Sequence, residues 1–147
     1  RQTVQFERKR AALERTLPPD AFDALRRAHA ALPGADLEYL RGLPRARQVT
    51  IDGVALCVCH GAPASARDML SADTPRVKFE RQREAAPVDI IVSGGSAEPF
   101  HREVGGTLFA GPGPLVAGPG RARYALVDTE REPWRVSFPE AGFTPEA

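Results

Sequence analysis

Residues 88–100 read VDIIVSGGSAEPF and decide the fold. The first five, Val88–Val92, form a short apolar run that is typical of a strand buried on both faces of a sheet. Two glycines and two serines follow, so the chain is expected to turn where this strand ends. The stretch therefore predicts a buried strand that ends in a tight glycine turn.

A second strand of the same kind lies earlier in the chain. Val54–Cys59 is apolar throughout, as expected of a strand covered on both faces. It follows another β-rich run, Arg47–Ile51, and only Asp52-Gly53 separates the two. Asp-Gly between two such runs is the strongest short signal for a β-hairpin. The sequence thus predicts a hairpin whose second strand is buried.

Helical patterns flank this hairpin. Asp20 is a plausible N-cap for the second of the helices that come before it. Pro18-Pro19 and Pro33-Gly34 separate the helices from one another. Helices are predicted over Gln5–Leu17, Ala21–Leu32 and Asp36–Arg41 before the hairpin, and over Ser65–Leu70 and Pro75–Ala85 after it.

The last part of the chain reads as antiparallel strands. Phe100–Val104 and Thr107–Ala110 enclose the turn residues Gly105-Gly106. Arg121–Asp128 alternates in polarity and is expected to pair with Trp134–Phe138. Helices, mixed strands and a closing antiparallel run in this order predict one α/β domain, or most of one.

Composition excludes several classes of function. The 147 residues carry a formal net charge of +1, which gives no strong field for nucleic acid or an anionic membrane. No apolar run reaches the roughly 18 residues that span a bilayer. Cys57 and Cys59 are too few for a disulfide framework and indicate a reducing cytoplasm. The chain begins with Arg1 rather than methionine, so we expect part of an N-terminus to be missing.

Several separated segments resemble, in order and spacing, calcineurin-like metallophosphoesterases. Cys57–Pro63 resembles the strand that ends in His-Gly-x-Pro, and Ser93–Phe100 resembles the Gly-His-x-His turn. Gly105–Pro114 resembles the strand and the Asn-Pro-Gly-Ser loop. Leu37–Pro44 and the hairpin of Arg123–Asp128 with the Trp134 strand resemble the outer segments. The similarity is greatest to small bacterial phosphodiesterases and implies the second half of an α/β sandwich, with a mixed sheet and C-terminal antiparallel hairpins.

The resemblance also implies which residues stand at the positions of the metal site. His60 stands where the family has a histidine ligand. Gly95 and Ala97 stand where the Gly-His-x-His turn carries its two histidines, and Gly111 replaces the loop asparagine. Glycine and alanine side chains offer no N, O or S donor to a divalent metal. The degenerate positions are Gly94, Gly95, Ser96, Ala97 and Gly111.

The motifs of the family's first half, Asp-x-His, Gly-Asp-x-x-Asp and Gly-Asn-His-Asp, are absent from the sequence. A dinuclear phosphoesterase needs two metals about 3.5–4 Å apart, which one histidine cannot hold. We therefore expect a non-catalytic pseudoenzyme without a cofactor that acts as a binding, regulatory or scaffolding subunit. The alternative is a fragment of a metal-dependent phosphoesterase or phosphodiesterase. In that case a missing N-terminal half supplies the other ligands for Mn, Fe, Ni or Zn.

The expected organisation is a helical segment at residues 1–36, followed by the metallophosphoesterase-like part at 37–147 as one structural unit. Because the family's central sheets draw strands from both halves, the resemblance implies exposed strand edges and apolar faces. We expect a missing N-terminal segment, a second copy or another protein to cover them. Neither nucleic acid nor a membrane is an expected partner.

Three other interpretations stay open. Cys57-x-Cys59-His60 offers sulfur and nitrogen to zinc, although no matching pair follows it. His101 lies near the degraded turn and is a conceivable substitute ligand. Ser93–Ser96 is compatible with a backbone nest for an anion, which is a weak signal because short Gly-Ser turns are common.

Overall fold

The computed structural model describes residues 5–143. The chain divides into two compact units, residues 1–44 and 45–147, which are described separately below. This division does not test the expected family boundary at residues 36 and 37, which stays a prediction. Within residues 5–143, no helix has the length and apolar character needed to cross a membrane.

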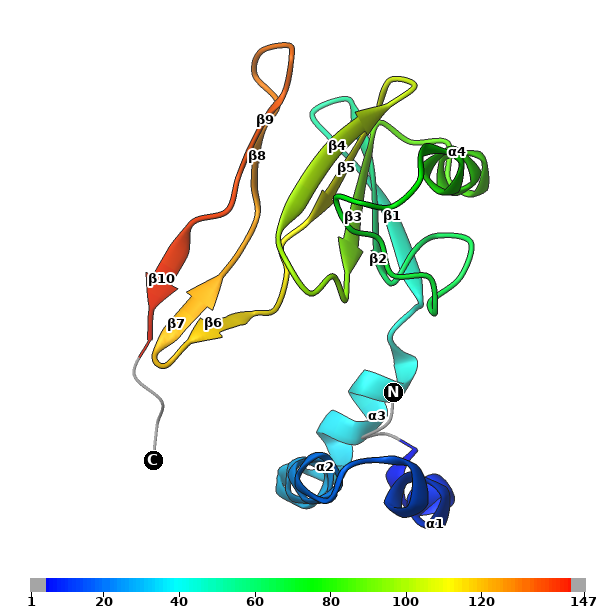
Figure 1. Ribbon diagram of the computed structural model, residues 1–147, viewed down its shortest axis with the longest axis vertical. Coiled ribbons are helices and arrows are strands. Elements are labelled where there is room, and N and C mark those ends of the chain that lie inside the picture. Colours follow the sequence, from blue (N-terminus) through cyan, green and yellow to red (C-terminus); the bar gives the residue numbers. More distant parts are fainter. Residues whose placement is uncertain (1–4, 144–147) are drawn as a thin grey trace. The chain divides into compact units, whose positions relative to one another are not determined.

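The first unit consists of three helices (Figure 1). Its apolar centre is Phe6, which is 2% exposed and packs against the rings of Phe22 and His29 at centroid distances of 5.7 and 5.1 Å. The expected N-cap at Asp20 is wrong. Pro18 is the N-cap and Pro19 begins the helix, since a proline needs no N–H partner in the first turn. The helices are α1 (Phe6–Thr16), α2 (Pro19–Ala31) and α3 (Gly34–Gly42).

The second unit begins with the predicted hairpin, which the structure confirms, but its second strand is buried on one face only, because Val58 is 48% exposed. Strands β1 (Ala46–Ile51) and β2 (Val54–His60) are antiparallel. Asp52 and Gly53 between them have φ of 50° and 82°, the left-handed pair that a two-residue hairpin turn requires. Asparagine, aspartate and glycine tolerate these angles, so this dipeptide fixes the register of the two strands.

The hairpin opens a five-stranded mixed sheet in the order β1-β2-β3-β5-β4 (Figure 1). Strands β2, β3 and β5 are parallel, and β1 and β4 are antiparallel to their neighbours. The predicted mixed α/β architecture is therefore confirmed. The other strands of the sheet are β3 (Ile90–Gly94), β4 (Phe100–Val104) and β5 (Thr107–Gly111). Helix α4 (Arg76–Ala85) lies between β2 and β3 in the sequence.

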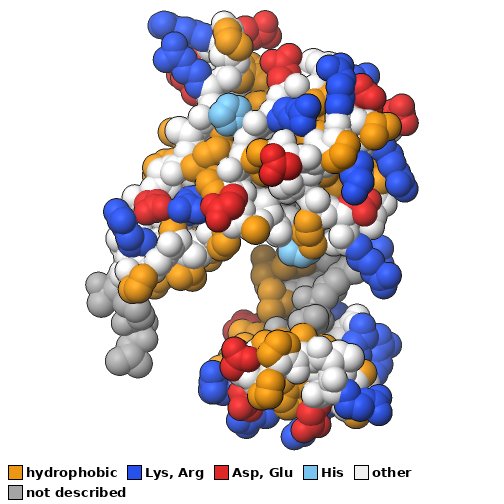
Figure 2. Space-filling view, in the orientation of Figure 1, with side chains coloured by type: hydrophobic (Ala, Val, Ile, Leu, Met, Phe, Trp, Pro, Cys, Tyr) orange, Lys and Arg blue, Asp and Glu red, His pale blue; other side chains and the backbone are white. Residues whose placement is uncertain are grey.

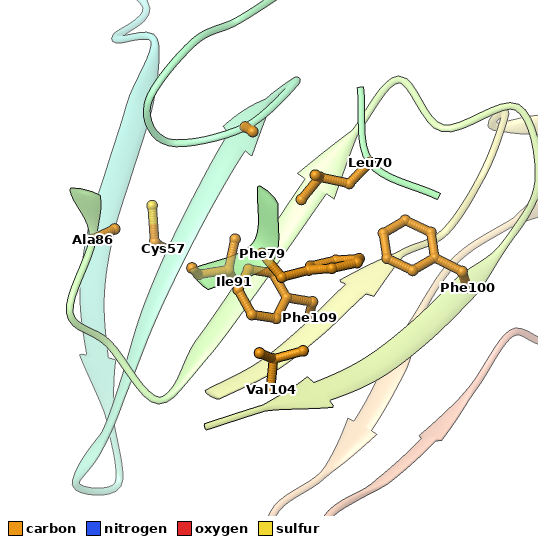
Figure 3. Packing of buried hydrophobic residues seen from close by; sticks show 9 residues of the cluster. Cys57, Leu70, Phe79, Ala86, Ile91, Phe100, Val104 and Phe109 are labelled. Carbon is orange, nitrogen blue, oxygen red and sulfur yellow. The ribbon is translucent and has the colours of Figure 1, made fainter. Parts of the chain in front are cut away.

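Helix α4 covers one face of this sheet. Its Phe79 is fully buried and lies edge-on to Phe109 of β5 at 4.9 Å between ring centroids (Figure 3). Arg102 of β4 places its guanidinium 5.2 Å above the Phe79 ring and donates to the Thr74 carbonyl. The core cluster consists of Cys57, Ala62, Leu70, Phe79, Ala86, Ile91, Phe100, Val104 and Phe109.

Two sequence predictions in this unit are wrong. Residues 65–70, expected to be helical, form turns, because Leu70 (1% exposed) is drawn into the core and Ala62 pairs with Ser65 as a β-bridge. The expected strand Arg121–Asp128 is two strands in different sheets, and the Tyr124 amide between them donates to the Pro139 carbonyl. The remaining strands, all antiparallel, are β6 (Val116–Gly118), β7 (Arg121–Arg123), β8 (Leu126–Asp128), β9 (Arg135–Ser137) and β10 (Glu140–Gly142).

Candidate functional site

The candidate site lies where the three parallel strands of the sheet end. His60, the last residue of β2, is in register with Gly94, the last residue of β3. Val92 of β3 is in register with Ala110 of β5, so Gly111 follows at the same edge. The carboxyl ends of parallel strands meet at one edge of a sheet, which is where open α/β sheets bind ligands. The structure thus brings His60, Gly94 and Gly111 to a common edge.

Gly95 is packed in a way that a histidine would disturb. Its φ is +94°, a backbone conformation that L side chains rarely adopt. A Cβ on this residue would lie 2.6 Å from Sδ of Met69 and 3.2 Å from Cε1 of His60. The thioether therefore lies where a side chain from position 95 would start. Sequence reasoning missed Met69, and no local pattern could have revealed it, because the contact is tertiary.

Gly111 is closed in a similar way. A Cβ there would lie 2.8 Å from Cδ1 of Phe100 and 2.8 Å from Oγ of Ser96. Phe100 is 4% exposed and belongs to the core, so it cannot swing away at low cost. The Ser96 hydroxyl is buried and has no hydrogen-bond partner within residues 5–143. Gly111 of β5 is therefore packed closely against the turn that contains Ser96.

The loop after His60 is held by buried hydrogen bonds. Gly61 has φ +72°, and a Cβ on it would lie 2.6 Å from the Ala66 carbonyl oxygen. Its amide donates to the Gly94 carbonyl at 2.8 Å, and the Ser93 hydroxyl donates to its carbonyl. Because the Ser93 hydroxyl is used in this way and the Ser96 hydroxyl is buried away from solvent, neither is accessible to an anion. The turn can offer only backbone N–H groups.

The two cysteines lie side by side on the buried face of β2. Burial is the main cause that raises the pKa of both thiols, that of Cys59 to about 12, and a hydrogen bond joins the two groups. Alternation along the strand places His60 on the opposite face from them. Within residues 5–143, no three His, Cys, Asp or Glu side chains form a group that could hold a metal ion. Cys57, Cys59 and His60 therefore do not converge as a zinc site would require.

The raised pKa of Cys59 predicts a loss of stability in alkali. Because the folded state favours the neutral thiol, Cys59 contributes to the free energy of unfolding. This contribution is complete below about pH 9, the ordinary thiol pKa, and is lost as the pH rises to about 12. Between these two pH values the free energy of unfolding falls by about 1.4 kcal/mol per pH unit for one such group. Urea unfolding between pH 8 and 11 should show a steeper fall for the native chain than for Cys59→Ala. Equal slopes for the two proteins would contradict the raised pKa of Cys59, since the two chains differ only in this thiol.

Comparison with known proteins identifies the fold. No family model matches the chain, and no curated protein matches its sequence. A hypothetical protein from Pyrococcus horikoshii OT3 has a TM-score of 0.71 at 21% identity, over 88% of this chain and 53% of its own. A metallophosphoesterase from Sphaerobacter thermophilus has a TM-score of 0.60 at 21% identity, over 86% of this chain and 59% of its own. The chain has a metallophosphoesterase-like fold.

A predicted phosphoesterase from Streptococcus pneumoniae TIGR4, described as a conserved uncharacterized protein, is also similar, with a TM-score of 0.52 at 17% identity over 75% of this chain and 68% of its own. The metallophosphoesterase-like fold class expected from the sequence is thus confirmed. The chain spans little more than half of the length of the Pyrococcus and Sphaerobacter structures. The match to the Pyrococcus protein covers more of the chain than the unit 45–147 contains, so it extends into the first unit, residues 1–44.

Proposed function

We propose that this chain is a degenerate metallophosphoesterase-like protein that does not hydrolyse phosphoesters and acts as a binding, regulatory or scaffolding subunit. The observation that carries the proposal is the packing at Gly95 and Gly111. Phe100, a core ring, closes the space at Gly111, whereas the thioether beside Gly95 belongs to Met69, a flexible side chain that is 47% exposed, so the packing at Gly111 is the stronger of the two. A site that had lost its ligands by substitution alone would leave these spaces open.

The remaining donors do not fit a dinuclear centre. Two ions about 3.5–4 Å apart need several shared and separate ligands to orient a phosphate and activate a hydroxide. Of the positions implied by the resemblance, only His60 has a side chain that can bind a metal through nitrogen. We therefore expect no resident metal in this protein and assign His60 no catalytic step.

Metal content tests this proposal. The full-length protein, purified without chelator, is expected to contain fewer than about 0.1 equivalents of any transition metal by elemental mass spectrometry, with the intact mass measured on the same sample. A value near two equivalents of Mn, Fe, Ni or Zn would overturn the proposal. Phosphodiesterase activity towards bis-p-nitrophenyl phosphate that rises with added Mn would overturn it as well.

A second candidate is favoured by the length of the neighbours. The chain covers only 53% of the Pyrococcus structure and 59% of the Sphaerobacter structure, so further polypeptide in a longer protein could supply ligands. The function would then be metal-dependent phosphoester hydrolysis, with His60 as one ligand. The metal measurement distinguishes the non-catalytic protein from the hydrolase. Only the hydrolase is expected to contain stoichiometric metal, and its intact mass should exceed the 15.9 kDa of this chain.

A protein partner is the binding function that the sheet supports best. On the face of the sheet opposite α4, apolar side chains in register form two rows across β2, β3 and β5. The first row continues to Val49 of β1, whereas the second ends against Arg47. The rows are buried at β5 and become exposed towards the hairpin, where Val58 is 48% exposed. Ile51, on the same face of β1 beside the first row, is 56% exposed. Contiguous exposed apolar surface of this kind marks interaction sites. The rows are Val49, Leu56, Ile90 and Leu108, and Val58, Val92 and Ala110.

The partner is expected to be polypeptide from outside these 147 residues, a second copy or another protein, in the cytoplasm, where both thiols stay reduced. Nucleic acid is not expected. Figure 2 shows acidic and basic side chains interspersed over the face in view, and the net charge is +1.

Binding of an apolar fluorescent dye tests whether this face is available. Val58→Glu places a carboxylate at the exposed end of the second row, opposite Arg47, so dye fluorescence should fall at least about twofold from that of the native chain. Thr50→Glu is the matched control, because Thr50 lies on the other face of neighbouring strand β1 and the charge change is the same. A native chain that binds no dye, or two variants that behave alike, would contradict an open apolar face.

A further inference from the structure

A separate cavity lies at the opposite end of the sheet from the candidate site. It measures about 330 Å³ and lies over the turn between β4 and β5. Strand β5 runs from this turn to Gly111, so roughly 13 Å of strand separates the cavity from the candidate site. Its lining residues are Glu103, Gly106, Leu108, Glu132, Pro133 and Trp134.

Two segments far apart in sequence build the cavity. Glu103 and Leu108 are cross-strand partners in β4 and β5, so their side chains lie on one face of the sheet. Glu132 and Trp134 come from the loop between β8 and β9. Gly106 keeps the mouth open, since a Cβ there would meet nothing within 4 Å. The volume is within the range of small-molecule sites.

The chemistry of the lining favours a cation. Two carboxylates and an indole ring line the cavity, and no lysine or arginine does. Within residues 5–143, neither Glu103 nor Glu132 makes an ion pair. Carboxylates attract a positive charge by Coulomb attraction, and the face of an indole is the best aromatic surface for a cation. The same charges repel a phosphate, the ligand of the metallophosphoesterase fold.

We propose that the cavity under Trp134 binds an organic cation of the alkylammonium or guanidinium class, either as a free small molecule or as a side chain of a bound polypeptide. Trp134 supplies the aromatic face, Leu108 the apolar floor and the two glutamates the compensating charge. This site does not depend on the loss of phosphoesterase activity proposed above, because none of its residues takes part in the degenerate metal site. It shares only Leu108 with the apolar rows. An active or an inactive phosphoesterase could equally carry it.

Intrinsic fluorescence tests the proposal directly, because Trp134 is the only tryptophan in the sequence. Two probes distinguish the sources: choline stands for a free cation, and Nα-acetyl-arginine-N-methylamide for a side chain. At least one should change the fluorescence of the full chain in a saturable way with a Kd on the order of millimolar. The uncharged isostere of choline, 3,3-dimethylbutan-1-ol, should not. Choline binding indicates the free source, and binding of the arginine amide alone indicates the side chain.

Glu132→Gln keeps the shape and the reporter but removes one charge, so it should weaken binding roughly tenfold, which corresponds to about 1.4 kcal/mol. Glu130→Gln is the matched control in the same loop, since Glu130 does not line the cavity, and it should bind as the native chain does. The proposal is overturned if neither probe binds, if the neutral isostere binds equally well, or if both variants keep native affinity.

Discussion

Gly111→Asn, which restores the residue type of the metallophosphoesterase loop, is expected to lower the free energy of unfolding by about 3 kcal/mol. The new side chain would start in contact with the ring of Phe100 and 2.8 Å from Oγ of Ser96. Phe100 is core and Ser96 is buried, so relief requires the whole turn after β3 to move. Urea unfolding at pH 7, followed by far-UV circular dichroism, measures the loss.

Gly118→Asn is the matched control. Gly118 also ends a strand, has no left-handed φ, and a Cβ on it would meet nothing within 4 Å. This variant should lose less than about 1 kcal/mol. If the two variants were equally stable, the space at Gly111 would be open in solution, and the central support for a non-catalytic function would be removed.

Local chemistry was sufficient to predict much of this fold. The Asp52-Gly53 turn needs no tertiary support, because few residues other than these accept its backbone angles. The two apolar runs, Val54–Cys59 and Val88–Val92, correspond to the central parallel strands β2 and β3. The run in β3 is buried as predicted, with Ile90 and Ile91 0% exposed. The run in β2 is covered on one face only, because Val58 is 48% exposed, and this difference depends on what packs against each strand.

The failures share a different cause. Residues 65–70 have a helical composition, but burial of Leu70 and the bridge between Ala62 and Ser65 outweigh that weak preference. At the site, the sequence showed that Gly95 and Gly111 lack donors, but not what occupies the space beside them. Met69 and Phe100 reach these glycines only through the tertiary fold. A sequence therefore shows which donors these positions lack, whereas only the fold shows what packs against them.

Phe79→Ala is expected to lower the free energy of unfolding by about 3–5 kcal/mol. Phe79 is fully buried, and its ring packs against Phe109 and Phe100 (Figure 3). The guanidinium of Arg102 lies 5.2 Å from the centre of the same ring. Its removal leaves a cavity between α4 and the sheet and takes away the aromatic partner of a cation. Because domains of this kind are stable by only about 5–15 kcal/mol, the loss should be visible as a large shift of the urea midpoint.

Val77→Ala on the same helix separates packing from helix propensity. Val77 is 67% exposed, so this variant should change stability by less than about 0.5 kcal/mol. A loss of similar size in both variants would mean that the fold depends on α4 as a helix and not on the ring of Phe79.

Combining Phe79→Ala with Gly111→Asn tests whether the core and the altered site are physically coupled. Phe100 lies between them, 6.3 Å from Phe79 by ring centroids and in contact with the space at Gly111. The cavity left by Phe79→Ala gives the Phe100 ring room to move away from the asparagine side chain that the second substitution introduces. The double variant should therefore lose about 1–2 kcal/mol less than the sum of the single losses. If the losses in the free energy of unfolding were strictly additive, the strain of Gly111→Asn would lie in the turn after β3 and not at the ring of Phe100. A positive coupling would instead show that the core packing keeps the space at Gly111 closed.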